Sequence, residues 1–172
     1  MVDVLGIVMA GGKSSRFGRE KLMAELNGRK IIDITVSNIS SSSVGKWKVA
    51  VSPNAPLTLE YCRKYDCILT PGSGYPEDVK FLLEKLKRPL LLLNGDSVFI
   101  DPLTINVFLS RFNGRSMTAV VKDGDVAVNI GLNIAVPGDT EDEIFEFKNP
   151  ILALNINTTD DLRRAELIAS DR

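Results

Sequence analysis

Short apolar runs alternate with amphipathic stretches along most of the chain. Val4–Ala10 and Leu90–Leu93 contain no polar side chain, and such runs are typical of strands buried on both faces of a parallel sheet. Gly11-Gly12 ends the first run, and Asn94-Gly95-Asp96 ends the second. Further short strands are expected over residues 47–51, 66–70, 117–122, 125–135, 144–147 and 152–156.

Helical patterns fill most of the intervals between these strands. The clearest is Glu77–Leu86, whose apolar residues fall on one face of a helix. Further helices are expected over residues 31–39, 57–65, 102–111 and 160–169, with Thr58 and Thr159 as N-cap candidates. The dipeptide Asp123-Gly124 predicts a hairpin between two strands.

This order of elements predicts an α/β fold. Strands that alternate with helices form βαβ units, which build a Rossmann-like three-layer sandwich with a mostly parallel sheet covered on both faces. The hairpin makes the sheet mixed. With 172 residues, of which 44 % are hydrophobic and 25 % charged, the chain suits a single domain over residues 1–172. Ligands of such sheets bind at the carboxyl ends of the strands.

Composition excludes several kinds of chemistry. The chain has no histidine, so Ser-His and Cys-His nucleophiles, His-ligated zinc and an imidazole base are all absent. The net charge of −1 produces no overall field that would attract nucleic acid or an anionic membrane. A polyanionic ligand must therefore be held by a local cluster of cations.

The cysteines and the first apolar run bear on where the protein works. Cys62 and Cys67 have a C-x4-C spacing, which fits neither a C-x-x-C redox motif nor a zinc knuckle, so two reduced thiols are expected. Val4–Ala10 is too short to span a membrane, and a basic loop rather than a cleavage site follows it. We therefore expect a soluble, cytoplasmic protein with no membrane insertion.

The loop after the first strand carries the strongest chemical signal. Gly11 and Gly12 follow that strand directly, where glycine lets backbone N–H groups approach a phosphate closely. The loop then has one acid, Glu20, and four cations, which are Lys13, Arg16, Arg19 and Lys21. The spacing fits neither a Walker A motif nor a G-x-G-x-x-G fingerprint. It predicts a phosphate-binding loop of another kind, with an ordinary strand-to-helix turn and solvated cations as the alternative.

Polar residues near two later strand ends are candidates for a metal site. Asp96 follows a buried strand, and Mg²⁺ needs only one or two carboxylates when phosphates and waters fill its octahedron. Asn155 and Asn157 would share one face of an extended strand. An ordinary turn for Asp96, and caps or turns for the asparagines, remain the alternatives.

The first loop resembles the signature of the nucleoside-triphosphate transferase superfamily, through Met9-Ala10-Gly11-Gly12-x3-Arg16-Phe17-Gly18-x2-Lys21. Further matching segments follow in order: Ser52-Pro53-Asn54-x-Pro56, Gly72-x-Gly74-Tyr75-x-Glu77-Asp78, Asp96, Gly131-x-Asn133 and Asn155-Ile156-Asn157-Thr158. Together they resemble the archaeal adenosylcobinamide-phosphate guanylyltransferases of cobalamin biosynthesis.

Two departures from the wider superfamily stand out. Leu69-Thr70 lies where relatives often place an acid near the nucleotide. Ser97-Val98-Phe99 replaces the Asp-x-Pro run of the molybdenum cofactor guanylyltransferases, which favours the cobinamide acceptor over molybdopterin. A molybdenum cofactor guanylyltransferase and a non-catalytic nucleotide-binding module remain the alternatives.

The resemblance implies a fold of the nucleotide-diphospho-sugar transferase type and a defined reaction. GTP would donate GMP to adenosylcobinamide phosphate, with Mg²⁺ as cofactor, and pyrophosphate would leave. A phosphate monoester has a second pKa near about 6, so this nucleophile needs no general base, in agreement with the lack of histidine. The two substrates are the expected partners, and the oligomeric state stays open.

The resemblance also assigns roles to residues. Arg16, Lys21 and Asp96 would be catalytic, and Asp96 with Asn157 would hold the metal. The nucleotide would contact Ala10, Gly11, Gly12, Lys13, Ser14, Ser52, Asn54, Gly74 and Tyr75. Gly131, Asn133 and Asn155 would face the acceptor. Ordinary packing remains an alternative for Tyr75.

Overall fold

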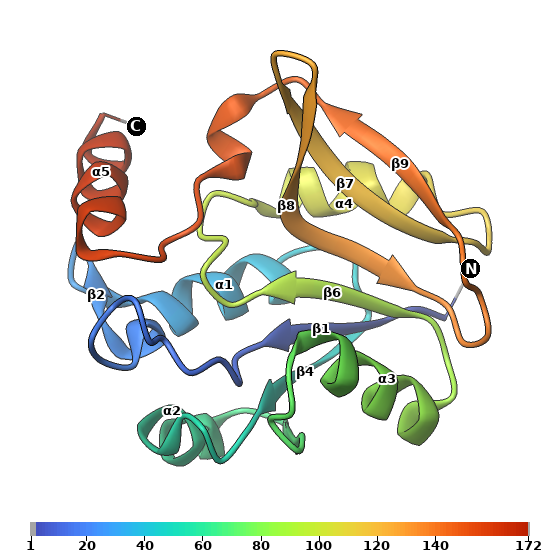
Figure 1. Cartoon of the computed structure of the whole chain (residues 1–172), viewed down its shortest axis with the longest axis horizontal. Helices are drawn as coiled ribbons and strands as arrows, with labels where there is room; N and C mark the ends of the chain where they lie inside the picture. The colour runs from blue at the N-terminus through green and yellow to red at the C-terminus, as the bar shows by residue number, and fades with distance from the viewer. Residues whose placement is uncertain (1–2, 172) are drawn as a thin grey trace.

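A computed structural model describes residues 3–171 of the chain, and its centre is a seven-stranded mixed sheet (Figure 1). The strand order is β5-β4-β1-β6-β8-β7-β9. The bounds are β1 Leu5–Met9, β4 Lys46–Val51, β5 Cys67–Leu69, β6 Leu90–Asn94, β7 Ser116–Asp123, β8 Val126–Ala135 and β9 Asp142–Phe147. A separate small hairpin pairs β2, Glu25–Leu26, with β3, Arg29–Lys30.

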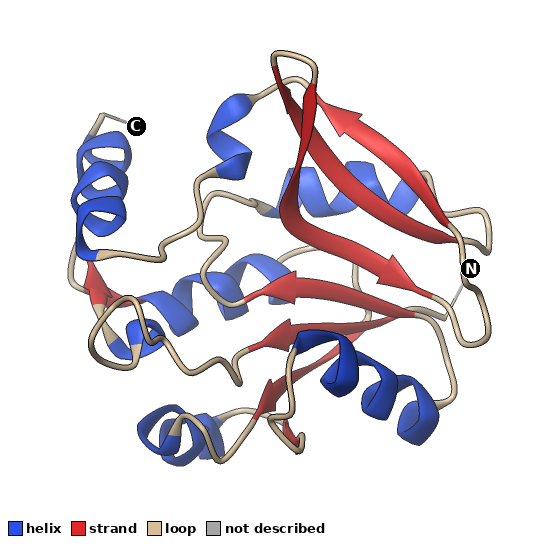
Figure 2. Cartoon of the chain, in the orientation of Figure 1, coloured by secondary structure: helices blue, strands red, loops and turns tan. Residues whose placement is uncertain are grey.

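Helices cover both faces of this sheet (Figure 2). Their bounds are α1 Ile31–Ser40, α2 Pro56–Tyr61, α3 Tyr75–Leu86, α4 Pro102–Ser110 and α5 Thr159–Ser170. Short 3₁₀ turns span Lys21–Met23, Cys62–Lys64 and Pro150–Ala153. None of the helices in the described part of the chain is both long and apolar enough to cross a membrane.

Alternate residues of the central strands pack into two different hydrophobic cores, because neighbouring side chains of a strand point to opposite faces. The side chains on the face of α1 and α4 include Val8, Leu91 and Leu93, and those on the face of α3 include Ile7, Leu90 and Leu92. This explains why the two runs are apolar throughout. The three-layer α/β sandwich expected from the sequence is confirmed.

The second half of the sheet contains the antiparallel element. β1 pairs in parallel with β4 and β6, and β4 pairs in parallel with β5. β8 is antiparallel to both β6 and β7, whereas β9 is parallel to β7. The hairpin expected at Asp123-Gly124 is therefore confirmed, and β8 alone runs against the other strands of this sheet.

Three local expectations are wrong. The segment expected as a strand over residues 152–156 begins instead as the 3₁₀ turn Pro150–Ala153, because Pro150 follows Asn149, whose side chain caps the turn at Ile151. Thr158, not Thr159, caps α5, in a reciprocal capping box with Asp161.

Thr58 is not an N-cap. The cap of α2 is Ala55, with Pro56 at the first helical position. Thr58 instead lies inside the first turn, where its backbone N–H donates to the Glu20 carboxylate.

The expectation of two reduced thiols is also wrong. Cys62 and Cys67 form a disulfide with a Cα–Cα distance of 6.2 Å. The turn after α2 brings Cys62 beside the start of β5, so the bond closes the short link between these elements. Cysteine usage therefore gives no argument for a cytoplasmic location.

Asp33 of α1 ties the same region to the rest of the fold. Tyr61 donates a hydrogen bond of 2.6 Å to its carboxylate, and Tyr65 donates another. Lys64 Nζ lies 3.1 Å from Asp33. Burial alone would raise the pKa of Asp33, but these hydrogen bonds and the nearby ammonium lower it overall.

Candidate active site

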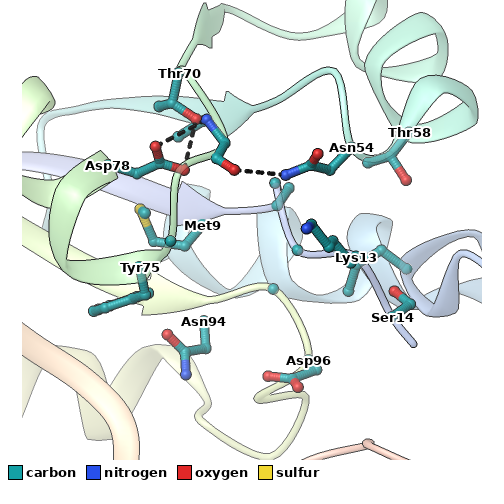
Figure 3. Close-up of a pocket in the computed structure, with 18 of the residues that line it drawn as sticks. Met9, Lys13, Ser14, Asn54, Thr58, Thr70, Tyr75, Asp78, Asn94 and Asp96 are labelled. Atoms are coloured by element: carbon teal, nitrogen blue, oxygen red, sulfur yellow. Dashed lines mark hydrogen bonds between the residues drawn. The ribbon is translucent and has the colours of Figure 1, made fainter. Parts of the chain in front are cut away.

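A pocket of about 520 Å³ opens at the carboxyl ends of the parallel strands β1, β4, β5 and β6. This is the edge at which ligands of open α/β sheets bind. Its lining residues are Met9–Ser14, Lys21, Leu22, Ala50, Asn54, Thr58, Thr70, Gly72–Tyr75, Asp78 and Asn94–Asp96. In Figure 3, Asn54, Thr70 and Asp78 lie along one side of the pocket, and Asn94 and Asp96 lie opposite.

The phosphate loop expected from the sequence forms one end of this pocket. Its first residue, Ala10, is buried and donates its backbone N–H to Ala50 at 2.7 Å. Gly11 packs so closely on Ser52 that a Cβ would lie 3.1 Å from the Ser52 side chain. Gly12, Lys13 and Ser14 also line the pocket. The structure thus brings these five expected nucleotide contacts, Ala10 to Ser14, together.

Ser52 supports this loop from behind and does not line the pocket. It is fully buried, and its hydroxyl donates to the Gly11 carbonyl at 2.6 Å. The same oxygen accepts the Asn54 backbone N–H at 3.2 Å. Ser52 therefore fixes the position of Gly11 relative to Asn54, and the structure gives it no direct route to a ligand.

Arg16 is exposed and is not among the residues lining the pocket. It lies in a turn closed by a hydrogen bond from Phe17 N to Ser14 O, and the buried Phe17 side chain anchors that turn. Arg16 is therefore beside the cradle but outside the cavity, and its catalytic role stays a prediction.

Lys21 reaches across the pocket to the end of β6. Its Nζ lies 2.6 Å from Asp96 Oδ2 and 3.2 Å from Asn157 Oδ1. Asp96 is only 8 % exposed, so its charge is largely shielded from water and depends on this partner. The three residues expected to handle the reacting phosphate and the metal are thus brought together from three distant segments.

The opposite wall is held by a carboxylate that sequence reasoning missed. Asp78, 6 % exposed, accepts hydrogen bonds from Gly72 N at 3.0 Å, Ser73 N at 3.3 Å and Thr70 Oγ1 at 3.0 Å. Asp78 lies in the first turn of α3, where an acid is normally explained by the helix dipole. α3 therefore places a carboxylate beside Thr70, although the Leu69-Thr70 segment itself contains no acid.

Asn54 and Gly74 complete this wall. Asn54 Nδ2 donates to the Gly72 carbonyl at 2.8 Å, and a Cβ on Gly72 would lie 2.6 Å from Asn54 Nδ2. Gly74 has a φ of 125° at the N-cap of α3, a conformation that favours glycine. Both predicted nucleotide residues, Asn54 and Gly74, line the pocket.

Tyr75 joins the pocket to the strand expected to face the acceptor. Its side chain lines the pocket, and the Asn133 side chain on β8 is close enough to affect the pKa of its phenol. Although 43 % of Tyr75 is exposed, the atoms packed around it raise the pKa of its phenol, and the nearby Asn133 side chain offsets only part of this. Asn133 itself is not among the residues that line the cavity.

Gly131 and Asn155 are not among the residues lining the pocket, and both lie next to Ser97. Gly131 has a φ of 85°, and a Cβ there would lie 2.4 Å from Ser97 Oγ and 2.8 Å from Asn94 Nδ2. Ser97 donates to Asn155 Oδ1 at 2.9 Å. The expected strand at Asn155 and Asn157 is wrong, because their segment follows a 3₁₀ turn and is not paired in a sheet. Their side chains nevertheless both reach the surroundings of Asp96, where they contact Ser97 and Lys21 respectively.

The candidate metal ligands are two oxygens of different kinds. Within residues 3–171, no cluster of three or more histidine, cysteine or acidic side chains could hold a metal. Asp96 and Asn157 nevertheless offer a carboxylate and a carboxamide oxygen that converge on one cation, the Lys21 ammonium. Hard oxygen donors of this kind fit Mg²⁺ when substrate phosphates and waters supply the remaining ligands.

The fold is that of an α/β protein with a pocket at the carboxyl ends of its parallel strands, and comparison with known proteins identifies the family. Residues 6–165 match the family model of the MobA-like NTP transferase domain. The chain belongs to that family and is a nucleotidyltransferase.

Individual relatives agree with this assignment. The adenosylcobinamide-phosphate guanylyltransferase of Methanocaldococcus jannaschii is 31 % identical, over 94 % of this chain and 95 % of the relative. A probable molybdenum cofactor guanylyltransferase of Pyrococcus horikoshii is 29 % identical, over 70 % of this chain and 62 % of the relative. The crystal structure of molybdopterin-guanine dinucleotide biosynthesis protein A from Archaeoglobus fulgidus has the same fold, with a TM-score of 0.73 and 18 % identity over 98 % of this chain and 100 % of that one.

Proposed function

We propose that the protein transfers GMP from GTP to adenosylcobinamide phosphate in cobalamin biosynthesis. The observation that carries the proposal is the convergence of the Gly11–Ser14 backbone, Lys21 and Asp96 on one pocket. The acceptor is taken from the Methanocaldococcus jannaschii relative, whose similarity extends over nearly the whole of both chains.

The reaction requires alignment and charge neutralisation more than proton transfer. An oxygen of the acceptor phosphate forms a bond to the α-phosphorus of GTP, the bond from that phosphorus to the bridging oxygen breaks, and pyrophosphate leaves. The acceptor phosphate is largely dianionic at neutral pH because its second pKa is about 6. Catalysis then depends on donors placed where negative charge develops.

Each side of the pocket contributes to that alignment. Backbone N–H groups of Gly11, Gly12 and Lys13 surround the triphosphate, and Lys21 reaches the α-phosphate. Arg16, which lies beside the cradle in an exposed turn, adds positive charge at the edge of the triphosphate site. Asp96 and Asn157 would hold Mg²⁺, which would supply positive charge to the phosphate oxygens.

The remaining predicted residues are assigned to the base and the acceptor. Asn54, Gly74 and Tyr75 contact the guanosine, with Ser52 supporting them through Gly11. Gly131, Asn133 and Asn155 shape the acceptor side: Gly131 packs against Asn94 and Ser97, Asn155 accepts a hydrogen bond from Ser97, and Asn133 lies near Tyr75. A corrinoid is too large for a 520 Å³ pocket, so its ring system lies outside and only its phosphate enters.

The test is an assay of pyrophosphate release with Mg²⁺, each of the four common ribonucleoside triphosphates, and either adenosylcobinamide phosphate or molybdopterin. We expect turnover with GTP and adenosylcobinamide phosphate. Turnover with molybdopterin alone would replace the acceptor and favour the function of the Pyrococcus horikoshii relative. Preference for CTP or UTP would contradict guanylyl transfer, and the lack of turnover with any pair would leave a nucleotide-binding module.

A further inference from the structure

One lysine contacts both candidate metal ligands, neutralising Asp96 and donating a hydrogen bond to Asn157. Lys21 Nζ is 2.6 Å from Asp96 Oδ2 and 3.2 Å from Asn157 Oδ1. The side chains of Lys21 and Asp96 are only 18 % and 11 % exposed, so this is not a solvent-screened surface pair. Charge-assisted hydrogen bonds in such surroundings are stronger than neutral ones.

We infer that Lys21 and a divalent cation compete for Asp96, so that the nucleotide-free protein binds the metal weakly. The inference rests on the proposed function, because it takes Asp96 and Asn157 as the metal ligands. The ammonium occupies the point on which both oxygens converge. A divalent ion on the same carboxylate oxygen would lie within a few ångströms of the ammonium charge, where repulsion between like charges is strong.

The nucleotide relieves this competition. Lys21 N donates to Ser14 Oγ at 3.2 Å, so the lysine backbone is fixed beside the phosphate cradle while its flexible four-carbon stem leaves Nζ free to move. A phosphate bound in the cradle offers the ammonium a second anionic partner, and Asp96 is then released for the metal. Binding linkage requires the effect to be reciprocal: the metal strengthens nucleotide binding to the same extent.

The exchange orders the binding events. Metal ion enters with or after the nucleotide, because Asp96 is available only once Lys21 has turned to a phosphate. In the absence of nucleotide, the Lys21–Asp96 pair keeps the pocket neutral on this side. Lys21 thereby has two successive partners, a carboxylate in the free protein and a phosphate in the complex.

The experiment measures Mn²⁺ binding to nucleotide-free protein from the electron paramagnetic resonance signal of free Mn²⁺. Lys21→Met removes the ammonium and keeps most of the stem, and we expect it to bind Mn²⁺ about tenfold more tightly than wild type, given the strength of charge-assisted hydrogen bonds. Lys21→Arg keeps the charge and should leave binding weak. Lys13→Met, which removes one positive charge from the same loop and pocket, is the matched control and should change affinity less than threefold.

Two further measurements make the result decisive. The double variant Lys21→Met with Asp96→Asn should not show the increased Mn²⁺ affinity of Lys21→Met, because it lacks the Asp96 carboxylate. In wild type, saturating GTP should raise Mn²⁺ affinity by a larger factor than in Lys21→Met. Lys21→Gln serves as a second neutral variant if the methionine variant does not fold, as judged by circular dichroism.

Equal or weaker Mn²⁺ binding in both neutral variants would overturn the inference, and so would an equal gain in Lys13→Met. The comparison needs neither an acceptor nor turnover. Failure of guanylyl transfer would therefore contradict the proposed function alone, while the nucleotide-free Mn²⁺ comparison would still decide whether Lys21 competes for Asp96.

Discussion

Glu20 Oε1 accepts the backbone N–H of Thr58 at 2.8 Å, and Oε2 of the same carboxylate accepts that of Leu57 at 3.0 Å. The first turn of a helix has N–H groups without intrahelical partners. For α2 the Glu20 carboxylate, 37 positions before Leu57 in the chain, supplies these partners. Because Glu20 immediately precedes Lys21, this cap also fixes the direction in which the lysine leaves the loop.

Glu20→Ala should therefore affect both stability and the site. Loss of the cap should lower the free energy of unfolding by about 1 kcal/mol, measured by urea denaturation, and should weaken GTP binding because the Lys21 end of the loop is less fixed. Glu60→Ala removes an exposed acid from α2 and should change neither quantity appreciably. Unchanged GTP affinity in Glu20→Ala would limit the cap to a structural role.

Much of the sheet follows from local sequence pattern. Val4–Ala10 and Leu90–Leu93 are predicted as strands because each lies between two cores and needs apolar side chains on both faces. The position of the phosphate loop is also predictable from the sequence, because the loop begins where β1 ends. That residues 1–172 form one domain stays a prediction.

Contacts between distant elements could not be predicted in the same way. Asp78 is indistinguishable in the sequence from an ordinary first-turn acid, and its meeting with Thr70 depends on the path of the intervening loop. Leu152, Leu154 and Ile156 alternate as in a strand, but Pro150 starts a 3₁₀ turn there. Periodicity describes burial, whereas these outcomes depend on which backbone groups find partners.

Asp78→Asn tests the carboxylate that supports the base side of the pocket. The amide group keeps one acceptor oxygen but places a donor opposite the N–H groups of Gly72 and Ser73 or the Thr70 hydroxyl. Mispaired buried donors should reduce stability by about 1–3 kcal/mol, and the KM for GTP should rise more than kcat falls. Glu77→Gln, at the exposed neighbouring position, is the control; equal effects of the two variants would contradict a specific role for Asp78.

Gly131→Ala tests the packing behind Asn94. The φ of 85° strains any L side chain, and the new Cβ would lie 2.4 Å from Ser97 Oγ. Gly138 has a similar φ of 79° with nothing within 4 Å of a built Cβ, so Gly138→Ala measures the backbone strain alone. We expect Gly131→Ala to be the less stable variant by about 1–3 kcal/mol and to lose turnover, whereas equal stabilities would show that Ser97 and Asn94 move aside freely.

Removal of the disulfide tests the link between α2 and β5. Replacing Cys62 and Cys67 together by alanine opens a loop with a sequence separation of 5, and the chain-entropy relation gives a loss of about 2 kcal/mol in unfolding free energy. Reduction of the wild type with dithiothreitol should produce a similar loss. The same reductant should leave the double variant unchanged, and an equal response of both proteins would show that the bond does not contribute.

Asp139 gives the protein an acid-sensitive contact between the start of β7 and the turn after β8. The Ser116 backbone N–H, at 2.8 Å, and then the Arg115 guanidinium lower the pKa of Asp139 from 3.8 to about 2. A pKa that is depressed in the folded state means that the stabilisation is complete above the unfolded value and is lost as the pH falls toward the folded value.

Wild type should therefore lose stability relative to Asp139→Asn as the pH falls from 4 to 2 in the window set by these pKa values. At neutral pH the variant should be the less stable protein, because an amide cannot replace the charge opposite Arg115. Urea denaturation at several pH values measures the difference directly, with Asp125→Asn in the exposed hairpin turn as the matched loss of one acid. Other carboxylates titrate in both proteins and cancel in the comparison, so a constant difference between pH 4 and 2 would rule out Asp139 as the acid-sensitive group.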